Sequence, residues 1–307
     1  MKEKHFPGGA WPVMLTPFTE SNEIDYGAVD KLVKWYIENK LSGIFAVCQS
    51  SEMFCLNLEE RVSLAKATVE AAEGRIPVIA SGHISDNMED QIYELQEISK
   101  TGVDAVILIT NRLAGKSESD EKWIENCEKI ISEIDPEIPL GLYECPYPYK
   151  RLVTPQIMKW CLDSRRFYFI KDTCCDIQQL KEKIDIARGS RLKIYNANST
   201  TLLASLKYGA AGYCGVMANF HPYLYAWMCD NFLAKKAEDL SDFMGITSLI
   251  ERQYYPVNAK YYLDSHENIP MTTRCRTKTP DGLTETFKQE IDMLYRITQK
   301  ERAVLNI

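Results

Sequence analysis

One lysine occupies a position from which its side chain could do covalent chemistry. Lys171 directly follows the apolar run Phe167-Tyr168-Phe169-Ile170, which predicts a buried strand. An ammonium group at the end of such a strand is poorly solvated, and poor solvation favours the neutral amine. A neutral amine can attack a ketone to form an imine, which then accepts electrons while a neighbouring C–C bond breaks or forms. The position therefore indicates Schiff-base chemistry, with a lysine that only extends toward solvent as the alternative.

Hydroxyl groups follow two other apolar runs. Tyr143 ends Pro139–Tyr143, where a phenol could pass a proton between a substrate and water. Ser50 and Ser51 lie in a turn that opens into a helix, and hydroxyls with backbone N–H groups at such a turn can hold a carboxylate. The alternatives are a packing tyrosine and a helix cap.

The cysteines and histidines do not indicate a metal site or a cofactor. The ten cysteines include no C-x-x-C pair and the four histidines are scattered singly, whereas zinc sites take ligands at recurrent short spacings. His83, after a strand, could act as a base, but a structural role is favoured. Cys174 and Cys175 are interpreted as small packing residues.

Eight apolar runs rich in β-formers would position these side chains. Amphipathic stretches such as Tyr26–Asn39, Leu58–Ala72 and Asn87–Lys100 lie between them. This alternation predicts parallel βαβ units and favours a (β/α)8 TIM barrel, whose active site lies at the C-terminal ends of the strands. A doubly wound sheet is the rival, weakened because no G-x-G-x-x-G follows the first run. The predicted strands are Trp11–Leu15, Gly43–Val47, Pro77–Ala80, Asp104–Ile109, Pro139–Tyr143, Phe167–Ile170, Leu192–Tyr195 and Gly212–Val216.

The pattern changes after residue 222, where helices follow with no strands between them. The predicted helices are Tyr223–Lys236, Leu240–Leu263 (kinked or divided at Pro256) and Asp281–Val304. Residues 1–222 are therefore expected to form the barrel, and residues 223–307 a C-terminal helical extension that completes it. The segment His266–Thr279 is interpreted as a solvated loop.

Composition sets limits on partners and location. The 307 residues are 45% apolar and 26% charged, with a net charge of −7 and interspersed signs, which argues against a nucleic-acid-binding surface. No window approaches the roughly 20 apolar residues of a membrane span, and the first residues do not resemble a secretion signal. A cytoplasmic protein is expected.

Five segments carry a family resemblance over roughly residues 9–231. They are Leu15-Thr16-Pro17-Phe18 with Ile24-Asp25; Gln49-Ser50-Ser51-Glu52; Tyr143-Glu144-Cys145-Pro146; Ile170-Lys171-Asp172-Thr173; and Gly209-Ala210-Ala211-Gly212 with Gly215 and Ala218-Asn219. In this order the chain resembles the dihydrodipicolinate synthase / N-acetylneuraminate lyase family of class I aldolases. The resemblance implies an eight-stranded barrel, a pyruvate-type donor, no metal, and a homotetramer or homodimer.

The resemblance also implies roles for particular residues. Lys171 would form the imine and Tyr143 would be the general acid/base. Substrate contacts would come from Gln49, Ser50, Ser51, Thr173, Asn198, Cys214 and Arg112.

The departures from the family pattern concern the substrate. Gln49 replaces the first hydroxyl of the carboxylate segment, and Asn111-Arg112-Leu113 replaces an aromatic pair that reaches a neighbouring active site. Pro148 stands where the synthases place an arginine, and Ser199 and Thr200 where the sialic acid lyases place acids. Thr173 matches the lyases.

A lyase that cleaves or forms a C–C bond next to a 2-keto acid is therefore expected, with a hydroxylated 2-keto (sugar) acid as the favoured substrate. A 2-keto-3-deoxy acid dehydratase and a synthase-like condensation use the same imine and stay open. A non-catalytic binding or regulatory protein on the same barrel is the alternative from another class, motivated by Gln49 and the missing aromatic pair.

Overall fold

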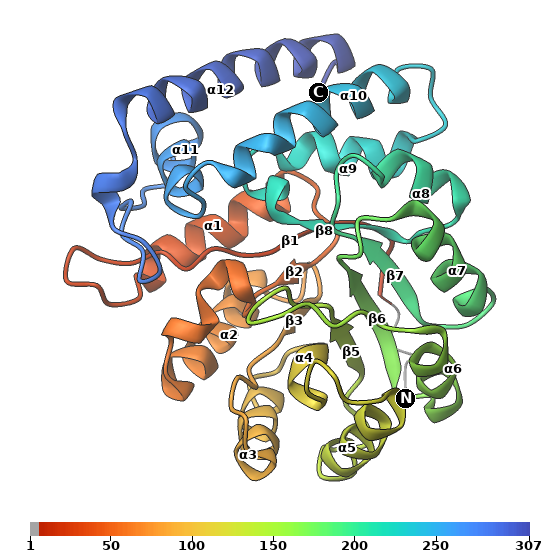
Figure 1. Cartoon of the computed structure of the whole chain (residues 1–307). Coiled ribbons are helices and arrows are strands. Elements are labelled where there is room, and N and C mark those ends of the chain that lie inside the picture. The colour runs from red at the N-terminus through yellow and green to blue at the C-terminus, as the bar shows by residue number, and fades with distance from the viewer. Residues whose placement is uncertain (1–5) are drawn as a thin grey trace.

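Eight parallel strands form a ring at the centre of the molecule, so the expected TIM barrel is confirmed (Figure 1). The computed structural model describes residues 6–307. Neighbouring strands pair in the order β1-β8-β7-β6-β5-β4-β3-β2, and a bridge between Val13 and Phe45 joins β1 to β2 and closes the ring. The strands are β1 (Gly9–Pro12), β2 (Ile44–Phe45), β3 (Val78–Ala80), β4 (Ala105–Ile109), β5 (Leu140–Tyr143), β6 (Phe167–Asp172), β7 (Lys193–Asn196) and β8 (Gly212–Gly215).

Helices surround the ring and alternate with the strands (Figure 1). Except for α4 and α8, they begin at side chains that accept backbone N–H groups; Asn57 and Glu60, for example, cap the start of α2 reciprocally. The helices up to β8 are α1 (Tyr26–Glu38), α2 (Leu58–Ala72), α3 (Met88–Ser99), α4 (Thr110–Leu113), α5 (Asp120–Ser132), α6 (Pro155–Ser164), α7 (Ile177–Ala187) and α8 (Leu202–Tyr208). The first strand begins and ends earlier than the predicted Trp11–Leu15, because the residues that pair with β8 are Gly9–Pro12.

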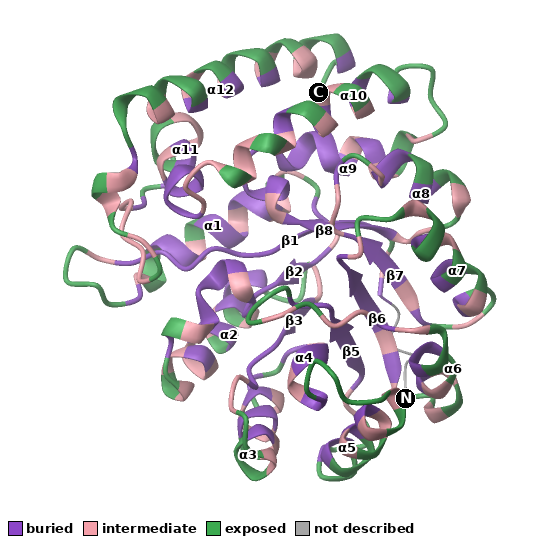
Figure 2. Cartoon of the chain, viewed as in Figure 1, coloured by how far each residue is buried: buried purple, intermediate pink, exposed green. Residues whose placement is uncertain are grey.

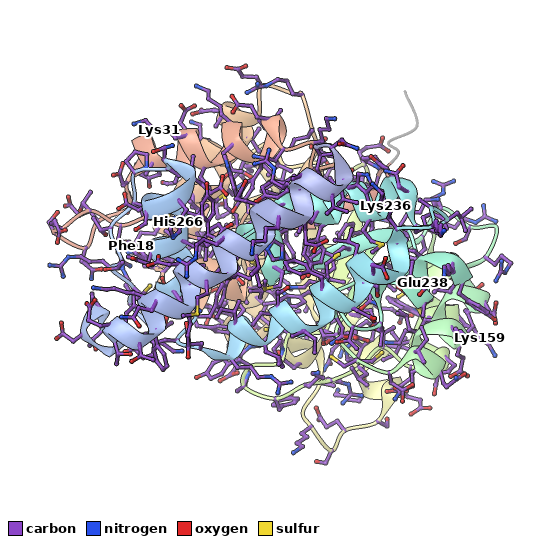
Figure 3. All side chains as sticks on the ribbon, turned by 90° about the horizontal axis from the view of Figure 1, so that it is seen from above. Phe18, Lys31, Lys159, Lys236, Glu238 and His266 are labelled. Carbon is purple, nitrogen blue, oxygen red and sulfur yellow. The ribbon has the colours of Figure 1, made fainter. Side chains whose placement is uncertain are left out.

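The C-terminal region is helical, as expected, but more divided than the pattern indicated. α9 (Pro222–Asn231) packs against β1 and β8, α10 (Ala237–Thr247) follows, and α12 (Glu285–Leu305) packs on α11 (Val257–Glu267). The division expected at Pro256 within Leu240–Leu263 is present, and the break is wider than expected, because the 3-10 turn η4 (Ser248–Arg252) also separates α10 from α11. His266 of α11 bonds to Asp292 of α12, and Lys236, just before α10, donates to the Val304 carbonyl of α12. Figure 3 labels His266 and Lys236 at opposite ends of the layer that the C-terminal helices form. Within residues 6–307 no helix is long and apolar enough to cross a bilayer.

The interpretation of His266–Thr279 as a solvated loop is wrong, because the loop is bonded to the barrel mouth. Glu52, in a left-handed conformation after β2, accepts the N–H groups of Arg276 and Thr277 at 2.7 and 2.8 Å. Its other oxygen lies 3.2 Å from Nζ of Lys260, a fully buried side chain of α11. Lys260 also donates to the Arg274 carbonyl at 2.5 Å, so one carboxylate joins β2, α11 and the loop.

Aromatic side chains fill the barrel below the strand ends. The rings of Phe169 and Tyr195 stack with centroids 4.1 Å apart, and Trp11 packs edge-on against both. Phe169 and Lys171 are two residues apart in β6, so both side chains lie on the inner face of the barrel. The strands are almost wholly buried (Figure 2), and Lys171 therefore stands on an apolar floor.

A buried ion cluster holds β5 and β6 against α7. Lys183 of α7 donates to Asp172 at 2.6 Å and makes a short hydrogen bond to Glu144. Burial alone would lower the pKa of Lys183, but attraction to Glu144 and Asp172 raises it, so the ammonium stays charged. Glu144 follows Tyr143, and Asp172 follows Lys171; consecutive strand residues point to opposite faces, so the cluster fixes the strand ends from outside the barrel.

Replacing Lys183 with Met should destabilise the protein by about 3–5 kcal/mol, because two buried carboxylates lose their counter-charge. Urea unfolding followed by circular dichroism measures the loss. The matched control is Lys181→Met on the same helix, where the lysine lies half-buried over the Tyr208 ring and the change should stay within about 1 kcal/mol. Equal losses in the two variants would contradict the role of the cluster.

Candidate active site

Lys171 ends in an apolar chamber at the floor of a cavity. Its side chain is 5% exposed, and its Nζ lies 4.3 Å from the centre of the Tyr143 ring and 5.8 Å from that of Phe45. Within residues 6–307 the ammonium makes no hydrogen bond or ion pair. The parallel register pairs Tyr143 of β5 directly with Lys171 of β6, so the fold brings these two predicted residues together.

The Cys145 thiol interacts with the side chains of both Tyr143 and Gln49. Burial, with the nearby Cys145 thiol, raises the pKa of Tyr143 well above its ordinary value, so the phenol keeps its proton at neutral pH. The thiol of Cys145 donates to the Gln49 side-chain carbonyl at 3.5 Å, and burial raises the pKa of this thiol to about 11. Gln49 lines the cavity, but an amide cannot titrate as a relay group would.

The two serines expected at the carboxylate site lie differently. Ser50 lines the cavity, whereas Ser51 does not belong to its lining. The Ser51 hydroxyl is fully buried, lies 2.6 Å from the carbonyl oxygens of Met14 and Ala46, and accepts the Cys48 N–H. Ser51 therefore holds the turn together, and of the two serines only Ser50 lines the cavity.

Three more expected contacts lie around the chamber. Thr173 lines the cavity, but its hydroxyl donates to the Glu144 carbonyl at 2.6 Å. Asn198 also lines it and accepts from Thr201 through Oδ1. Cys214 is buried in β8 outside the lining; burial raises its pKa to about 12, and the Lys171 ammonium partly offsets this rise.

Arg112 lies outside the cavity lining. It pairs with Asp86, and its guanidinium stands over the Phe54 ring at 5.5 Å. The side chain of its neighbour Asn111 has a structural role, because its amide donates to the carbonyl oxygens of Cys145, Tyr147 and Tyr149. The expected contact between Arg112 and the distal part of a substrate therefore finds no support in its position.

The cavity itself has a volume of about 540 Å³, enough for a small metabolite. Sequence patterns missed several charged residues of its wall, because they come from loops and from η4. They are Lys150, Glu251, Arg252 and Lys278. Lys150 donates to the Thr173 carbonyl at 2.6 Å, and Lys278 lies over the Tyr254 ring at 4.9 Å, so cations surround the mouth although Pro148 replaces an arginine.

His83 belongs to the framework, whereas Cys175, which was expected to be a packing residue, is exposed and lines the cavity. His83 is fully buried, accepts the Ile109 N–H through Nε2 and bonds to Gln91 through Nδ1. Burial lowers the pKa of His83 to about 4, so the ring is neutral and held in place. All ten cysteines are free thiols. The described residues include no group of three His, Cys, Asp or Glu side chains that could hold a metal ion.

Comparison with known proteins identifies relatives over most of the chain. The model of the Dihydrodipicolinate synthetase family matches residues 7–278. A 4-hydroxy-tetrahydrodipicolinate synthase of Clostridium tetani is 30% identical over 232 residues, which cover 75% of this chain and 76% of the relative.

Solved structures share the fold. A dihydrodipicolinate synthase of Bacillus anthracis superposes with a TM-score of 0.84 at 23% identity, covering 95% of this chain and 99% of the other. A dihydrodipicolinate synthase of Acinetobacter baumannii, complexed with pyruvate, gives a TM-score of 0.82 at 22% identity, with coverage of 95% and 99%.

The barrel fold, the buried lysine at the cavity floor and the match to the family model all point to the same class of protein. The expectation of an enzyme is confirmed, since the relatives are lyases of the carbon–carbon type. The chain belongs to the Dihydrodipicolinate synthetase family, and it is a lyase of the class I aldolase type.

Proposed function

We propose that the chain forms an imine between Lys171 and the 2-keto group of pyruvate or of a longer 2-keto acid. The observation that carries this proposal is the position of Lys171, buried at the cavity floor against the Tyr143 ring with no ion-pair partner among residues 6–307. Among these residues its amine has no bonded partner to give up before it attacks a carbonyl. The pyruvate bound to the Acinetobacter baumannii relative supports the same donor.

The carboxylate of the keto acid would lie beside Ser50. This serine belongs to a tight turn at the cavity wall, and backbone N–H groups of such turns hold carboxylates. Gln49 and Asn198 would contact the rest of the ligand through their amides, and Thr173 would do so through its backbone and methyl group. Tyr143, as a protonated phenol, would donate to the oxygen that leaves C2 as the imine forms.

A hydroxylated 2-keto acid is the substrate class we favour. Ser199 and Thr200 line the cavity with Asn198, and such neutral groups suit hydroxyls. The second candidate is condensation of pyruvate with an aldehyde that carries a carboxylate, which the names of the relatives and the cations Lys150, Arg252 and Lys278 support. A dehydratase shares the imine, and a product assay that separates aldehyde release, water loss and condensation distinguishes the three.

The cytoplasmic location and a homotetramer or homodimer stay predictions. A non-catalytic binding protein would keep the cavity and fail to form a covalent adduct, so imine trapping also addresses that alternative.

Reduction with borohydride in the presence of pyruvate should attach one pyruvyl group to Lys171, detected by mass spectrometry of peptides. Lys171→Ala should keep its circular dichroism spectrum and lose the adduct. The matched control is Lys150→Ala, which removes another lysine of the same cavity and should still be labelled at Lys171. Unfolding of Lys171→Ala, or no adduct across a panel of 2-keto acids, would sink the proposal.

Replacing Tyr143 with Phe should lower kcat by about 10²–10⁴-fold, the usual contribution of a positioned proton donor. The ring still packs on Phe45, so thermal stability should change little. Tyr147→Phe is the control: this exposed tyrosine packs edge-on against Phe54 and does not line the cavity. Steady-state kinetics with equal loss in both variants would argue against a role for the Tyr143 hydroxyl.

A further inference from the structure

Glu251 places a carboxyl group in the wall of the cavity that holds Lys171. It belongs to η4, the 3-10 turn between α10 and α11, and its side chain is half-buried. Glu52 is the other carboxylate of the lining, and both of its oxygens are bonded to Lys260 and to the loop at Thr277. Within residues 6–307, Glu251 has no hydrogen bond or ion pair, which leaves its oxygens available to a ligand.

Two cations and three phenols lie close enough to Glu251 to interact with its charge. Burial raises the pKa of Glu251 to about 7, while the cations of Lys171 and Arg252 pull it down in part. The three phenols are those of Tyr213 and Tyr225, which are buried, and that of Tyr255, which is half-buried.

Those phenols are bonded to the framework. Tyr225 bonds to Ser199 at 2.6 Å, Tyr213 accepts the Met217 N–H, and Tyr255 accepts from Asn219. They therefore do not compete for Glu251, which changes its charge within the physiological range of pH.

The later step of an aldol cleavage needs a base for the C4 hydroxyl, a role that Tyr143 fills poorly. Its pKa lies well above the ordinary value because of burial, so forming a phenolate at neutral pH is costly. Gln49, where relatives have a relay hydroxyl, cannot take up a proton. A base whose pKa lies near the working pH is the efficient choice.

We propose that Glu251 is a catalytic residue that accepts the proton of the C4 hydroxyl when a 4-hydroxy-2-keto acid, bound as an imine to Lys171, is cleaved. This inference rests on the proposed function. As the O–H proton moves to the carboxylate, C4–O becomes a carbonyl and the C3–C4 bond breaks. The electron pair of that bond forms the C2=C3 double bond of the enamine and neutralises the iminium.

The remaining steps return the site to its starting state. The aldehyde leaves, and the proton on Glu251 is delivered to C3 of the enamine, which restores the iminium. Water then hydrolyses the iminium, releasing pyruvate and the free amine of Lys171 and returning a proton to Tyr143. No oxidant or further reactant is needed. The ligand class that follows is a 4-hydroxy-2-keto acid whose C4 substituent lies beside Glu251, which disfavours a second carboxylate at that point.

The test measures pyruvate release from a panel of 4-hydroxy-2-keto acids that carry hydroxyls at C5 and C6, as a function of pH. The carboxylate form is required, so kcat/KM should fall as pH drops below about 7 and level off above it. Glu251→Gln should lower kcat by about 10²–10⁴-fold and lose this acidic limb. It should still form the borohydride-trapped pyruvate adduct on Lys171, while Glu251→Asp should retain a titrating limb.

Glu267→Gln is the matched control. Glu267 is a half-buried carboxyl of α11 whose pKa burial also raises, but it bonds to Trp35 and lies outside the cavity. This variant should keep both the rate and the acidic limb.

The results distinguish a failure of the role proposed for Glu251 from a failure of the imine chemistry proposed for Lys171. If the unaltered protein traps pyruvate but Glu251→Gln cleaves at the same rate with the same limb, or no panel member releases pyruvate, the role of Glu251 is wrong and the imine stands. If the unaltered protein traps no 2-keto acid, the proposed function itself is overturned.

Discussion

The buried cluster of Lys183, Glu144 and Asp172 is the constraint on which the site depends. Each carboxylate directly follows a residue that faces the cavity, Tyr143 or Lys171, and the alternation of strand side chains sends the two members of each pair to opposite faces. One ammonium on α7 therefore fixes the relative height of β5 and β6. That register places the ring of Tyr143 4.3 Å from Nζ of Lys171. Buried ions are tolerated here because each has an opposite charge and further hydrogen bonds.

A second buried pair closes the other side of the mouth. Glu52 and Lys260 join β2 to α11 and hold the loop that carries Thr277 and Lys278 into the cavity wall. The C-terminal helices thus do more than cover the barrel. They bring η4 against the strand ends, and η4 supplies Glu251.

The chamber separates two kinds of environment over a short distance. Below Lys171 lie Trp11, Phe169 and Tyr195, which offer nothing to an ammonium group except ring faces. Above it lie amides, hydroxyls and a carboxyl whose pKa is near neutrality. The apolar floor leaves the amine of Lys171 without a bonded partner among the described residues, and a polar wall can bind and deprotonate an oxygen of the substrate. The two halves of a retro-aldol cleavage therefore match the two halves of the cavity.

Local sequence patterns were enough to predict the barrel and the pairing of Lys171 with Tyr143 at its centre. Apolar runs in alternation with amphipathic stretches predict eight strands, and residues that end such runs must gather at one rim, which is why Lys171 and Tyr143 could be chosen. The directions of individual side chains, and their contacts with distant segments, depend on the tertiary structure and could not be predicted from local patterns. Ser51 turns inward to the carbonyls of Met14 and Ala46, and Arg112 pairs with Asp86. Glu251 reaches the cavity only because α10, α11 and the Glu52–Lys260 pair fold η4 over the mouth; no local pattern encodes contacts between segments so far apart in the chain.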